Sequence, residues 1–361
     1  MRKDALAFLQ ALLDAPSPSG YEGPARRLWV DAMEAVADEV RVDVHGNAIA
    51  TINPGGSPKV MLAGHIDEIG FQICHIDPTG FLRFRPIGGH DMRAIAGRRI
   101  SIHTARGPVF GVIGKRPIHL IADRNRSTPP PKAQSFWIDA GFSNRKHAEK
   151  FIQLGDPATY TEGFSPLRDK LVVARGLDNK VGAFVVAEVL AALAKGRQGK
   201  RPAKLAAEVS AVATVQEEIG LRGAQTSAFG LSPDVGIAVD VTWATDNPGG
   251  DAREIGEVAL GQGPVVVRGA NANPRLFDHL TQAAHAGRIP IQIRALPRAA
   301  GNDANAIQIS GAGVAAGVVG IPQRYMHTPV EICHLGDVDR AIKLLVRTLR
   351  GMNARSSFIP E

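Results

Sequence analysis

Hydrophobic runs alternate with amphipathic segments along the second half of the chain. Each of five apolar runs is followed by a segment whose apolar residues have helical spacing. The runs lie at residues 170–178, 205–218, 235–246, 289–297 and 313–322. Apolar strands that alternate with helices are typical of a sheet that is covered on both faces. The pattern therefore predicts an α/β fold with a mixed, mostly parallel sheet flanked by helices.

The first 70 residues continue the same pattern. The apolar positions of residues 1–14 follow helical spacing, and a second helix is expected over residues 25–37. Residues 40–53 alternate between apolar and polar side chains around a His-Gly-Asn turn, which predicts a hairpin. Residues 59–71 form a continuous apolar strand that ends in polar residues, so they belong to the same sheet as the later strands.

The pattern changes between residues 71 and 160, where short alternating runs are separated by glycine and proline. This texture predicts a small β-rich unit, a barrel that is closed or nearly closed and so hides its strand edges. Residues 124–132 are rich in proline and predict an extended, mobile loop within it. We therefore expect one domain made of residues 1–70 and 161–361, with residues 71–160 inserted into it as a β-barrel-like domain.

Charge and cysteine usage narrow the possible partners. The net charge of the 361-residue chain is +7, from 42 Lys and Arg against 35 Asp and Glu. The densest basic segments, residues 114–120 and 195–204, lack the interleaved aromatic residues of a nucleic-acid-binding surface, so no nucleic-acid partner is expected. Cys74 and Cys333 have no metal-ligand spacing, which favours reduced thiols in a cytoplasmic protein.

Neither a signal peptide nor a membrane span is expected. Asp4, Gln10 and Asp14 interrupt the apolar positions near the amino terminus. The longest apolar run, residues 181–194, contains Glu188 and is too short to cross a bilayer. We therefore expect no membrane partner.

Polar side chains stand at the ends of five apolar runs. In an open α/β sheet, ligands bind beyond the carboxyl ends of the strands. The polar residues at these positions are His65, Asp67, Asp178, Glu217, Glu218, Asp240 and His327. Each has a simpler explanation alone, for example His65 as a hydrogen-bonded core histidine or Asp178 as a helix N-cap. Metal-competent groups at all five strand ends favour a shared site over coincidence.

Glu217 and Glu218 stand side by side where an apolar run meets a glycine-rich segment. Neighbouring side chains on a strand point to opposite faces, so these are either solvated charges at a helix start or carboxylates that a break in the strand directs into one site. Histidines and carboxylates without cysteine suit Zn, Co or Mn bound for hydrolysis. The ligands are too many for one catalytic zinc and fit two divalent metal ions that share a bridging carboxylate.

Several motifs occur in order from one end of the chain to the other. They are PSPSGYEGPAR (16–26), AGHIDEIGF (63–71), GVIGKRPIHL (111–120), WIDAG (137–141), LDNKVGA (177–183), QEEIGLRGA (216–224) and IPQRYMHTPVE (321–331). Together they resemble the motifs of the glutamyl aminopeptidase family of dinuclear metallopeptidases. That family includes the tetrahedral, self-compartmentalising (TET) aminopeptidases, and some of its members carry an endoglucanase label.

The resemblance implies a zinc-exopeptidase-like fold and a role for each metal ligand. His65 and Asp240 would hold one metal ion, and Glu218 and His327 would hold the other. Asp178 would bridge the two ions. Zinc is the expected metal, with cobalt or manganese as alternatives.

The resemblance also implies two further roles at the site. Asp67 would orient the imidazole of His65, and Glu217 would be the general base that takes a proton from the attacking water and passes it to the leaving amine. The sequence departs from the family pattern at Lys180, where arginine is usual, and at Asn302, where the family often has threonine. Neither residue is a proposed ligand, so these departures bear on side-chain specificity rather than on the chemistry.

What the resemblance implies is a metal-dependent aminopeptidase that removes amino-terminal residues from short peptides. A deacylase or a carboxypeptidase on the same fold stays open, because a fold does not fix the substrate. A glycoside hydrolase is a less favoured alternative. It needs a pair of carboxylates that flank the glycosidic bond, whereas the acidic residues here come with histidines at strand ends, which favours metal chemistry. The family also implies a homo-oligomer, in which the inserted domain forms dimers that build to a dodecamer.

Overall fold

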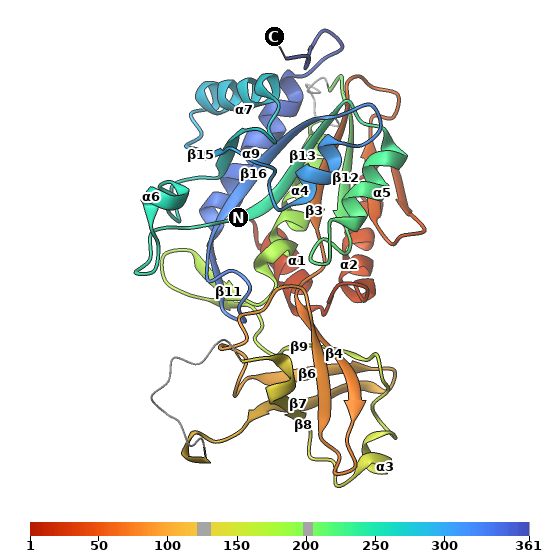
Figure 1. The fold of residues 1–361 in the computed structure, drawn as a ribbon. Helices are drawn as coiled ribbons and strands as arrows, with labels where there is room; N and C mark the ends of the chain where they lie inside the picture. Colours follow the sequence, from red (N-terminus) through yellow and green to blue (C-terminus); the bar gives the residue numbers. More distant parts are fainter. Residues whose placement is uncertain (121–130, 198–204, 361) are drawn as a thin grey trace.

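The structure is a computed structural model that describes residues 1–120, 131–197 and 205–360. A large α/β unit carries a small barrel at one end, with helices α1 (Lys3–Asp14) and α2 (Gly23–Glu34) near the junction (Figure 1). Most of the predicted proline-rich loop at 124–132, and most of the basic segment at 195–204, lie outside the described residues. None of the described helices is both long enough and apolar enough to span a membrane.

Within the described residues, the large unit contains an eleven-stranded sheet. In spatial order its main path is β1 (Glu39–Val42), β2 (Ala48–Ile52), β12 (Glu208–Thr214), β3 (Lys59–His65), β13 (Val235–Trp243), β16 (Ala315–Arg324), β17 (Glu331–His334), β11 (Leu171–Ala174) and β10 (Ser165–Pro166). The two remaining strands are β14 (Val265–Gly269), which pairs with β16, and β15 (Gln292–Leu296), which pairs with β14.

The predicted mixed sheet is confirmed, and its parallel pairs are concentrated at the centre. Strands β12, β3, β13 and β16 run parallel to one another, as do β14 and β15. The outer strands are antiparallel, including the predicted hairpin of β1 and β2. The carboxyl ends of the four central strands therefore meet at one edge, which faces the barrel in Figure 1.

Helices cover both faces of this sheet, as expected. The bounds are α1 (Lys3–Asp14), α2 (Gly23–Glu34), α4 (Leu177–Arg197), α5 (Arg222–Leu231), α6 (Ala252–Ile255), α7 (Pro274–Gly287), α8 (Asp303–Gln308) and α9 (Leu335–Gly351). The side chains of β3 alternate between the two faces. Val60 and Leu62 join the core beneath α1, α2, α4, α7 and α9, whereas Met61 and Ala63 join the smaller core beneath α5 and α8.

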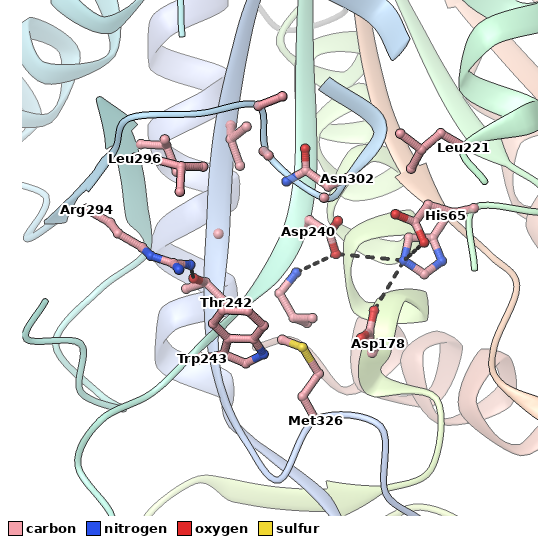
Figure 2. Close-up of a pocket in the computed structure, with 18 of the residues that line it drawn as sticks. His65, Asp178, Leu221, Asp240, Thr242, Trp243, Arg294, Leu296, Asn302 and Met326 are labelled. Carbon is pink, nitrogen blue, oxygen red and sulfur yellow. Dashed lines mark hydrogen bonds and ion pairs between the residues drawn. The ribbon is translucent and has the colours of Figure 1, made fainter. Parts of the chain in front are cut away.

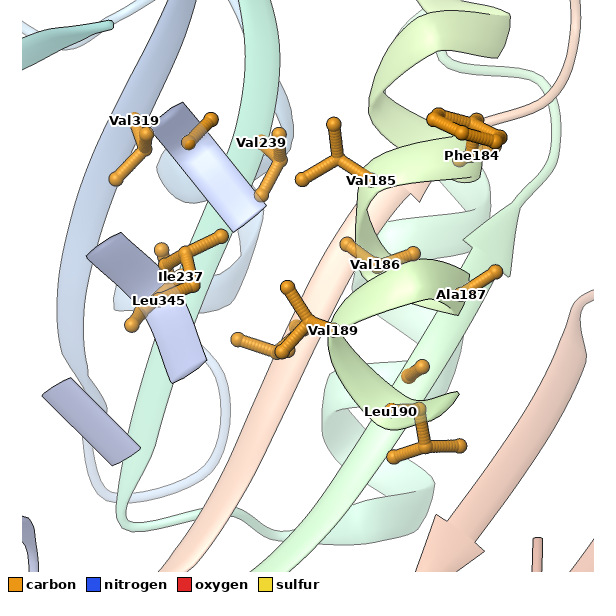
Figure 3. Close-up of a cluster of buried hydrophobic side chains, with 14 of the residues drawn as sticks. Phe184, Val185, Val186, Ala187, Val189, Leu190, Ile237, Val239, Val319 and Leu345 are labelled. Atoms are coloured by element: carbon orange, nitrogen blue, oxygen red, sulfur yellow. The ribbon is translucent and has the colours of Figure 1, made fainter. Parts of the chain in front are cut away.

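The larger core is built around α4. This helix is apolar on nearly every side, and Phe184, Val185 and Val189 are fully buried. Figure 3 shows α4 packed beside the strand residues Ile237 and Val239. Because α4 begins at the edge where the central strands end, this packing fixes the position of its first residues.

The β-rich segment is a closed barrel with its own core. Its strands, in order around the barrel, are β4 (Gly70–Ile76), β5 (Leu82–Ile87), β8 (Phe136–Asp139), β7 (Gly107–Lys115), β6 (Arg99–Thr104) and β9 (Pro157–Tyr160). A short helix, α3 (Arg145–Ala148), and two 3-10 turns, Ile118–Leu120 and Ala133–Ser135, complete it. Closure pairs the strand edges, which confirms the predicted barrel-like unit.

One sequence expectation is corrected at the junction with the barrel. Residues 59–71 are not one strand, because β3 ends at His65 and β4 begins at Gly70. The intervening residues are held by backbone partners elsewhere, since Ile66 N–H donates to Thr214 O and Glu68 N–H donates to Ser17 O. The chain thus leaves the sheet at the point where His65 and Asp67 stand.

Candidate active site

The predicted polar residues come together in one cavity at the carboxyl edge of the central strands. The cavity has a volume of about 460 Å³. Its lining includes His65, Asp178, Glu217, Glu218, Asp240 and His327. His65 ends β3, Asp178 lies in the first turn of α4, both glutamates follow β12, Asp240 lies within β13 and His327 follows β16, so only the complete sheet brings them together. Asp67, the seventh predicted residue, is fully buried beneath them.

Asp178 lies between the two histidines. Its Oδ1 is 3.2 Å from Nε2 of His65, and its Oδ2 is 3.3 Å from Nε2 of His327. Each oxygen of this carboxylate therefore faces a different imidazole. Figure 2 shows Asp178 and Asp240, which line the cavity, joined to His65 by dashed lines.

Among the described residues, three overlapping groups of side chains have donor atoms close enough to share a cation. They are His65 with Asp178 and Asp240, Asp178 with Glu218 and His327, and His65 with Glu217 and Glu218. Within each group, the donor atoms lie within 4.8 Å of one another. The first two groups have Asp178 in common. Their other members are His65 and Asp240 in one group and Glu218 and His327 in the other, which is the division that the sequence resemblance implies.

Asp67 holds the backbone of the two adjacent glutamates. Its Oδ1 accepts the N–H of Glu217 at 3.0 Å, and its Oδ2 accepts the N–H of Glu218 at 3.2 Å. Ser19 Oγ also donates to Oδ2, at 2.7 Å. Asp67 Oδ1 lies 3.4 Å from Nδ1 of His65, and the backbone carbonyl oxygen of Asp67 lies closer to the same nitrogen, at 3.1 Å.

The loop after β12 turns sharply before the two glutamates. Gln216 has a left-handed backbone, with φ of 57°, and so does His327, with φ of 61°. Such values are uncommon for residues other than glycine, and they cluster at functional sites, where the surrounding structure holds the strain. Both glutamate side chains reach the same cavity because the chain has already left the strand at Thr214.

Glu331 is a residue of this site that the sequence reasoning missed. It is buried, and its Oε2 accepts the N–H of Asp178 at 3.0 Å. Its Oε1 accepts the N–H of His327 at 2.9 Å. One carboxylate therefore fixes the backbone of two cavity residues that are far apart in sequence. The quoted motif contains this glutamate four positions after His327, which is the signal that could have singled it out.

The cluster carries more negative charge than its imidazoles balance. Burial, together with the carboxylate of Asp240, raises the pKa of Glu217 to about 9. Burial, together with the carboxylate of Asp178, raises the pKa of Asp240 to about 8. The pKa of Glu218 is raised in the same way, and its buried Oε1 forms no hydrogen bond, with Nε2 of His327 3.5 Å away. Buried carboxylates that are driven to retain protons, with one oxygen lacking a hydrogen bond, fit a site for divalent cations.

The histidines complete this balance. Burial opposes a charge on His65, but Glu217, Asp178 and Asp67 outweigh it and raise its pKa well above 6.5. Burial likewise opposes ionisation of Asp178, yet hydrogen bonds from His327 and His65 hold its pKa below the ordinary value. The ionised Asp178 therefore depends on positive charge at both of its oxygens.

Lys180, which departs from the family pattern, stands away from the cavity. It is fully buried, and its Nζ lies 2.8 Å from Oε1 of Glu68 and 2.6 Å from the carbonyl oxygen of Ala15. Arg175 donates to the same glutamate at 2.6 and 2.7 Å. These contacts tie α4 to the segment after β3, so Lys180 supports the site without lining it.

A loop of the barrel approaches two of the cavity residues. A Cβ on Gly88, whose φ is 73°, would stand 2.7 Å from Ile69 Cγ2 and 3.1 Å from Glu218 Oε2. A Cβ on Gly89 would stand 3.2 Å from Nδ1 of His327. The barrel therefore forms one wall of the site, and only glycine fits this closely against both side chains.

Comparisons with known proteins agree with this fold and site. The family model described as M42 glutamyl aminopeptidase matches residues 46–344. The lysyl aminopeptidase of Pyrococcus furiosus is 38% identical over 339 residues, which cover 93% of this chain and 94% of that protein.

Solved structures of this kind superpose over almost the whole chain. The TET aminopeptidase of Thaumarchaeota archaeon SCGC AB-539-E09 has a TM-score of 0.92 at 30% identity and covers 98% of both chains. The TET1 peptidase of Pyrococcus horikoshii, described as assembling into a tetrahedron or a large octahedral shell, has a TM-score of 0.84 at 29% identity. The superposition covers 96% of this chain and 100% of the Pyrococcus horikoshii chain.

The fold and the acid–imidazole cluster define a zinc-exopeptidase-like protein. The chain belongs to the M42 glutamyl aminopeptidase family. It is therefore a peptide hydrolase, and the expectation of a peptidase drawn from the sequence motifs is confirmed.

Proposed function

We propose that the chain is an aminopeptidase that uses two divalent metal ions and a glutamate base. Asp178 would bridge the two ions. His65 and Asp240 would complete one site, and Glu218 and His327 would complete the other. The observation that carries this assignment is the position of Asp178, with one carboxylate oxygen facing each histidine.

Zinc is the metal we favour, with cobalt or manganese as alternatives. The donor set contains only imidazole nitrogen and carboxylate oxygen, which suits these ions at a hydrolytic site. When bound, such ions would polarise the scissile carbonyl and lower the pKa of a water molecule at the site. The two donor groups that share Asp178 support the presence of two ions rather than one.

Glu217 is the proposed general base. It belongs to one of the three donor groups, whereas its neighbour Glu218 belongs to two. Its Oε2 is 3.8 Å from Nε2 of His65, so the carboxylate lies beside the cluster and lines the cavity. From this position it would take a proton from water and deliver it to the leaving amine. Asp67 would keep it there through its backbone N–H.

The alternative amide hydrolases differ in which end of the substrate they require. A deacylase acts on a blocked amine and a carboxypeptidase needs a free carboxyl terminus, whereas an aminopeptidase needs a free amine. A glycoside hydrolase is disfavoured, because the carboxylates here surround histidines instead of flanking an open sugar site. The cavity, about 460 Å³ in volume, suits a short peptide end.

The decisive experiment combines metal analysis with a panel of substrates. Aminoacyl-anilides with a free amine should be hydrolysed by protein that holds two ions per chain, and their N-acetylated counterparts should not. Equal or faster hydrolysis of the blocked anilides would replace this proposal with a deacylase. Release of residues only from free carboxyl termini would replace it with a carboxypeptidase.

We also propose that the barrel mediates self-association in the cytoplasm, in dimers that build to a dodecamer. The shell described for the Pyrococcus horikoshii peptidase supports this proposal. Strand β7 exposes Phe110 and Val112, which are 68% and 46% exposed and offer apolar surface to a second copy. Light scattering at micromolar concentration tests the proposal, since a monomeric wild-type chain would contradict it.

A further inference from the structure

Three consecutive backbone N–H groups in the loop after β12 are held by two carboxylates. The N–H of Gln216 donates to Oε1 of Glu22 at 3.2 Å. The N–H groups of Glu217 and Glu218 donate to the two oxygens of Asp67, at 3.0 and 3.2 Å. The backbone of the proposed base is therefore held both at its own N–H and at the residue before it.

Glu22 is itself fixed in place. It is 5% exposed, and the N–H of Gly20 donates to the same Oε1 at 2.7 Å. It stands at the amino-terminal end of α2, where its side chain forms no capping hydrogen bond with the helix. The helix is anchored in turn, because Nε1 of the buried Trp29 donates to the carbonyl oxygen of Ala183 on α4 at 2.9 Å. The carboxylate of Glu22 thus contacts the loop after β12 instead of capping its own helix.

This contact lies at the most constrained residue of the loop. Gln216 has a φ of 57°, in the left-handed region that residues other than glycine seldom adopt. Such a conformation persists only where the surrounding structure holds it. Glu22 holds the N–H of this residue, and its carbonyl oxygen accepts the N–H of Arg222 at 3.3 Å. The turn that is held in this way directs the next side chain, Glu217, into the cavity.

Glu22 belongs to the motif PSPSGYEGPAR (16–26), none of whose residues takes part in the proposed chemistry. Ser19 of the same motif donates to Oδ2 of Asp67 at 2.7 Å. Both carboxylates that hold the loop therefore depend on one segment near the amino terminus, since Glu22 is part of it and Asp67 is contacted by it. These contacts give the motif a physical role, which is to fix the loop that carries the two glutamates.

We infer that Glu22 is a positioning residue for the general base and acts through the backbone of Gln216. This inference rests on the proposed role of Glu217. Glu22 is not among the described residues that line the cavity, so its effect on catalysis must pass through the loop. It differs from Asp67, which also holds the backbone of the proposed metal ligand Glu218. Loss of Glu22 should therefore reduce turnover and leave both ions bound.

The first test compares Glu22→Ala with Glu22→Gln in zinc-loaded protein. The alanine variant lacks the acceptor for Gln216, whereas the glutamine variant keeps a carbonyl oxygen there. Burial, together with the carboxylate of Asp67, raises the pKa of Glu22 to about 7, so a neutral side chain suits this position.

The substrate is the aminoacyl-p-nitroanilide that the wild type hydrolyses fastest. Misplacement of a catalytic group by about 1 Å can cost about 100-fold in rate, and we expect kcat to fall about 10-fold in Glu22→Ala, with little change in KM. Glu22→Gln should return kcat close to the wild-type value. Wild-type kcat in Glu22→Ala, or a glutamine variant as slow as the alanine variant, would overturn the inference.

The second test asks whether Glu22 acts through Glu217. Residues that act as one unit have effects that do not add in a double-mutant cycle. Glu22→Ala should therefore cause little further loss of kcat in the Glu217→Gln background. A further 10-fold loss in that background would mean that Glu22 supports the site independently of the base, and would overturn the inference alone. Wild-type turnover by Glu217→Gln would instead refute the proposed base, and the inference with it.

Hydrogen exchange gives a readout that does not depend on activity. Peptides that contain residues 215–221 should exchange faster in metal-free Glu22→Ala than in the metal-free wild type, and Glu22→Gln should restore slow exchange. Elemental analysis should find two ions in both variants after zinc is added. Unchanged exchange in this segment would contradict the inference, and loss of an ion in Glu22→Ala would assign the contact to the metal ligands instead.

The matched control is Glu34→Ala. Glu34 is exposed at the other end of α2, so its replacement removes a carboxylate from the same helix and should leave kcat and exchange unchanged. A loss in this control as large as in Glu22→Ala would overturn the inference. If Glu22→Ala does not fold, Glu22→Asp takes its place, since aspartate suits a helix N-cap but is one methylene shorter. It should lower kcat in the same way, and wild-type kcat in Glu22→Asp would contradict the inference.

Discussion

The carboxylate of Asp67 accepts a hydrogen bond from the backbone N–H of Glu217 at 3.0 Å, across 150 positions of sequence. The second oxygen of the same carboxylate accepts the N–H of Glu218. One buried side chain therefore sets the position of both adjacent glutamates, to which the proposal gives different roles.

Asp67→Ala should impair both roles at once. It leaves the part-buried N–H groups of Glu217 and Glu218 without their acceptors, each at a cost of at most about 1–3 kcal/mol. The loss of such a supporting contact typically costs about 10–100-fold in metal affinity or activity. Metal content and kcat/KM measured on the same sample check this prediction. Ser19→Ala removes one donor to Asp67 and should have a smaller effect.

Glu217→Gln should lower catalysis without loss of metal, if Glu217 is the base and not a metal ligand. It keeps the size of the side chain and removes its basicity, and a positioned acid–base group contributes about 10²–10⁴-fold. We therefore expect kcat to fall within that range while two ions remain bound. Glu218→Gln should instead release one ion, with partial rescue by added metal. The reverse pattern in the two variants would mean that the adjacent glutamates have exchanged roles.

Asp178→Ala should remove both ions, since its two oxygens face both proposed sites. Elemental analysis after dialysis is the measurement. Asp240→Ala is the matched comparison, because Asp240 belongs to one donor group only and its loss should affect one ion. Two tightly bound ions in Asp178→Ala would disprove the bridge.

Removal of metal should make stability fall as pH rises. In the metal-free protein, the pKa of Glu217 is raised from 4.5 to about 9 and that of Asp240 from 3.8 to about 8, chiefly by burial. At low pH each carboxyl group is protonated in both the folded and the unfolded protein, so it costs no folding free energy. As pH rises above the unfolded pKa, only the unfolded protein loses the proton readily, and stability is lost until the pH has passed the folded pKa. Melting temperatures of chelated protein should therefore decrease between pH 5 and about 9, and zinc should remove most of this dependence. Glu217→Gln should lessen the slope, and an unchanged slope would contradict the assigned cause.

Gly89→Ala, in a loop of the barrel, should disturb the proposed metal ligand His327. The added Cβ would stand 3.2 Å from Nδ1 of His327 and 3.5 Å from its Cε1, so the imidazole must shift by a few tenths of an ångström. Misplacement by about 1 Å can cost 10²-fold in rate, and we expect a smaller loss here, with weaker retention of one ion. Gly230→Ala, where no atom lies within 4 Å of the added Cβ, is the control and should retain full activity.

The sequence predicts the parts of this fold that depend on local pattern. The alternation of apolar runs and helices indicates the sheet and its covering helices, and the strand ends indicate the cavity residues such as His65 and Asp240. The closed barrel follows from short alternating runs that would otherwise leave exposed edges. The roles of the cavity residues stay predictions.

Contacts between distant segments are not visible in such patterns. Glu331 binds the backbone of Asp178 across 153 positions, and nothing in its own neighbourhood in sequence indicates that partner. Gly88 and Gly89 look like ordinary turn glycines until the barrel is placed against the cavity. Arg294 likewise belongs to an ordinary strand, and only the structure shows that no carboxylate of the described residues pairs with it.

The sequence separation of the cavity residues bears on synthesis of the protein. The side chains that would hold the first ion include His65 and Asp240, and those of the second include His327, which lies 262 positions after His65. The central strands β3, β13 and β16 must therefore all be present before the cluster can form. Under the proposed assignment of metal ligands, a nascent chain would cleave peptides only after the segment through His327 has left the ribosome and joined the sheet. The order of the strands would thus delay hydrolytic activity until folding of the catalytic unit is nearly finished.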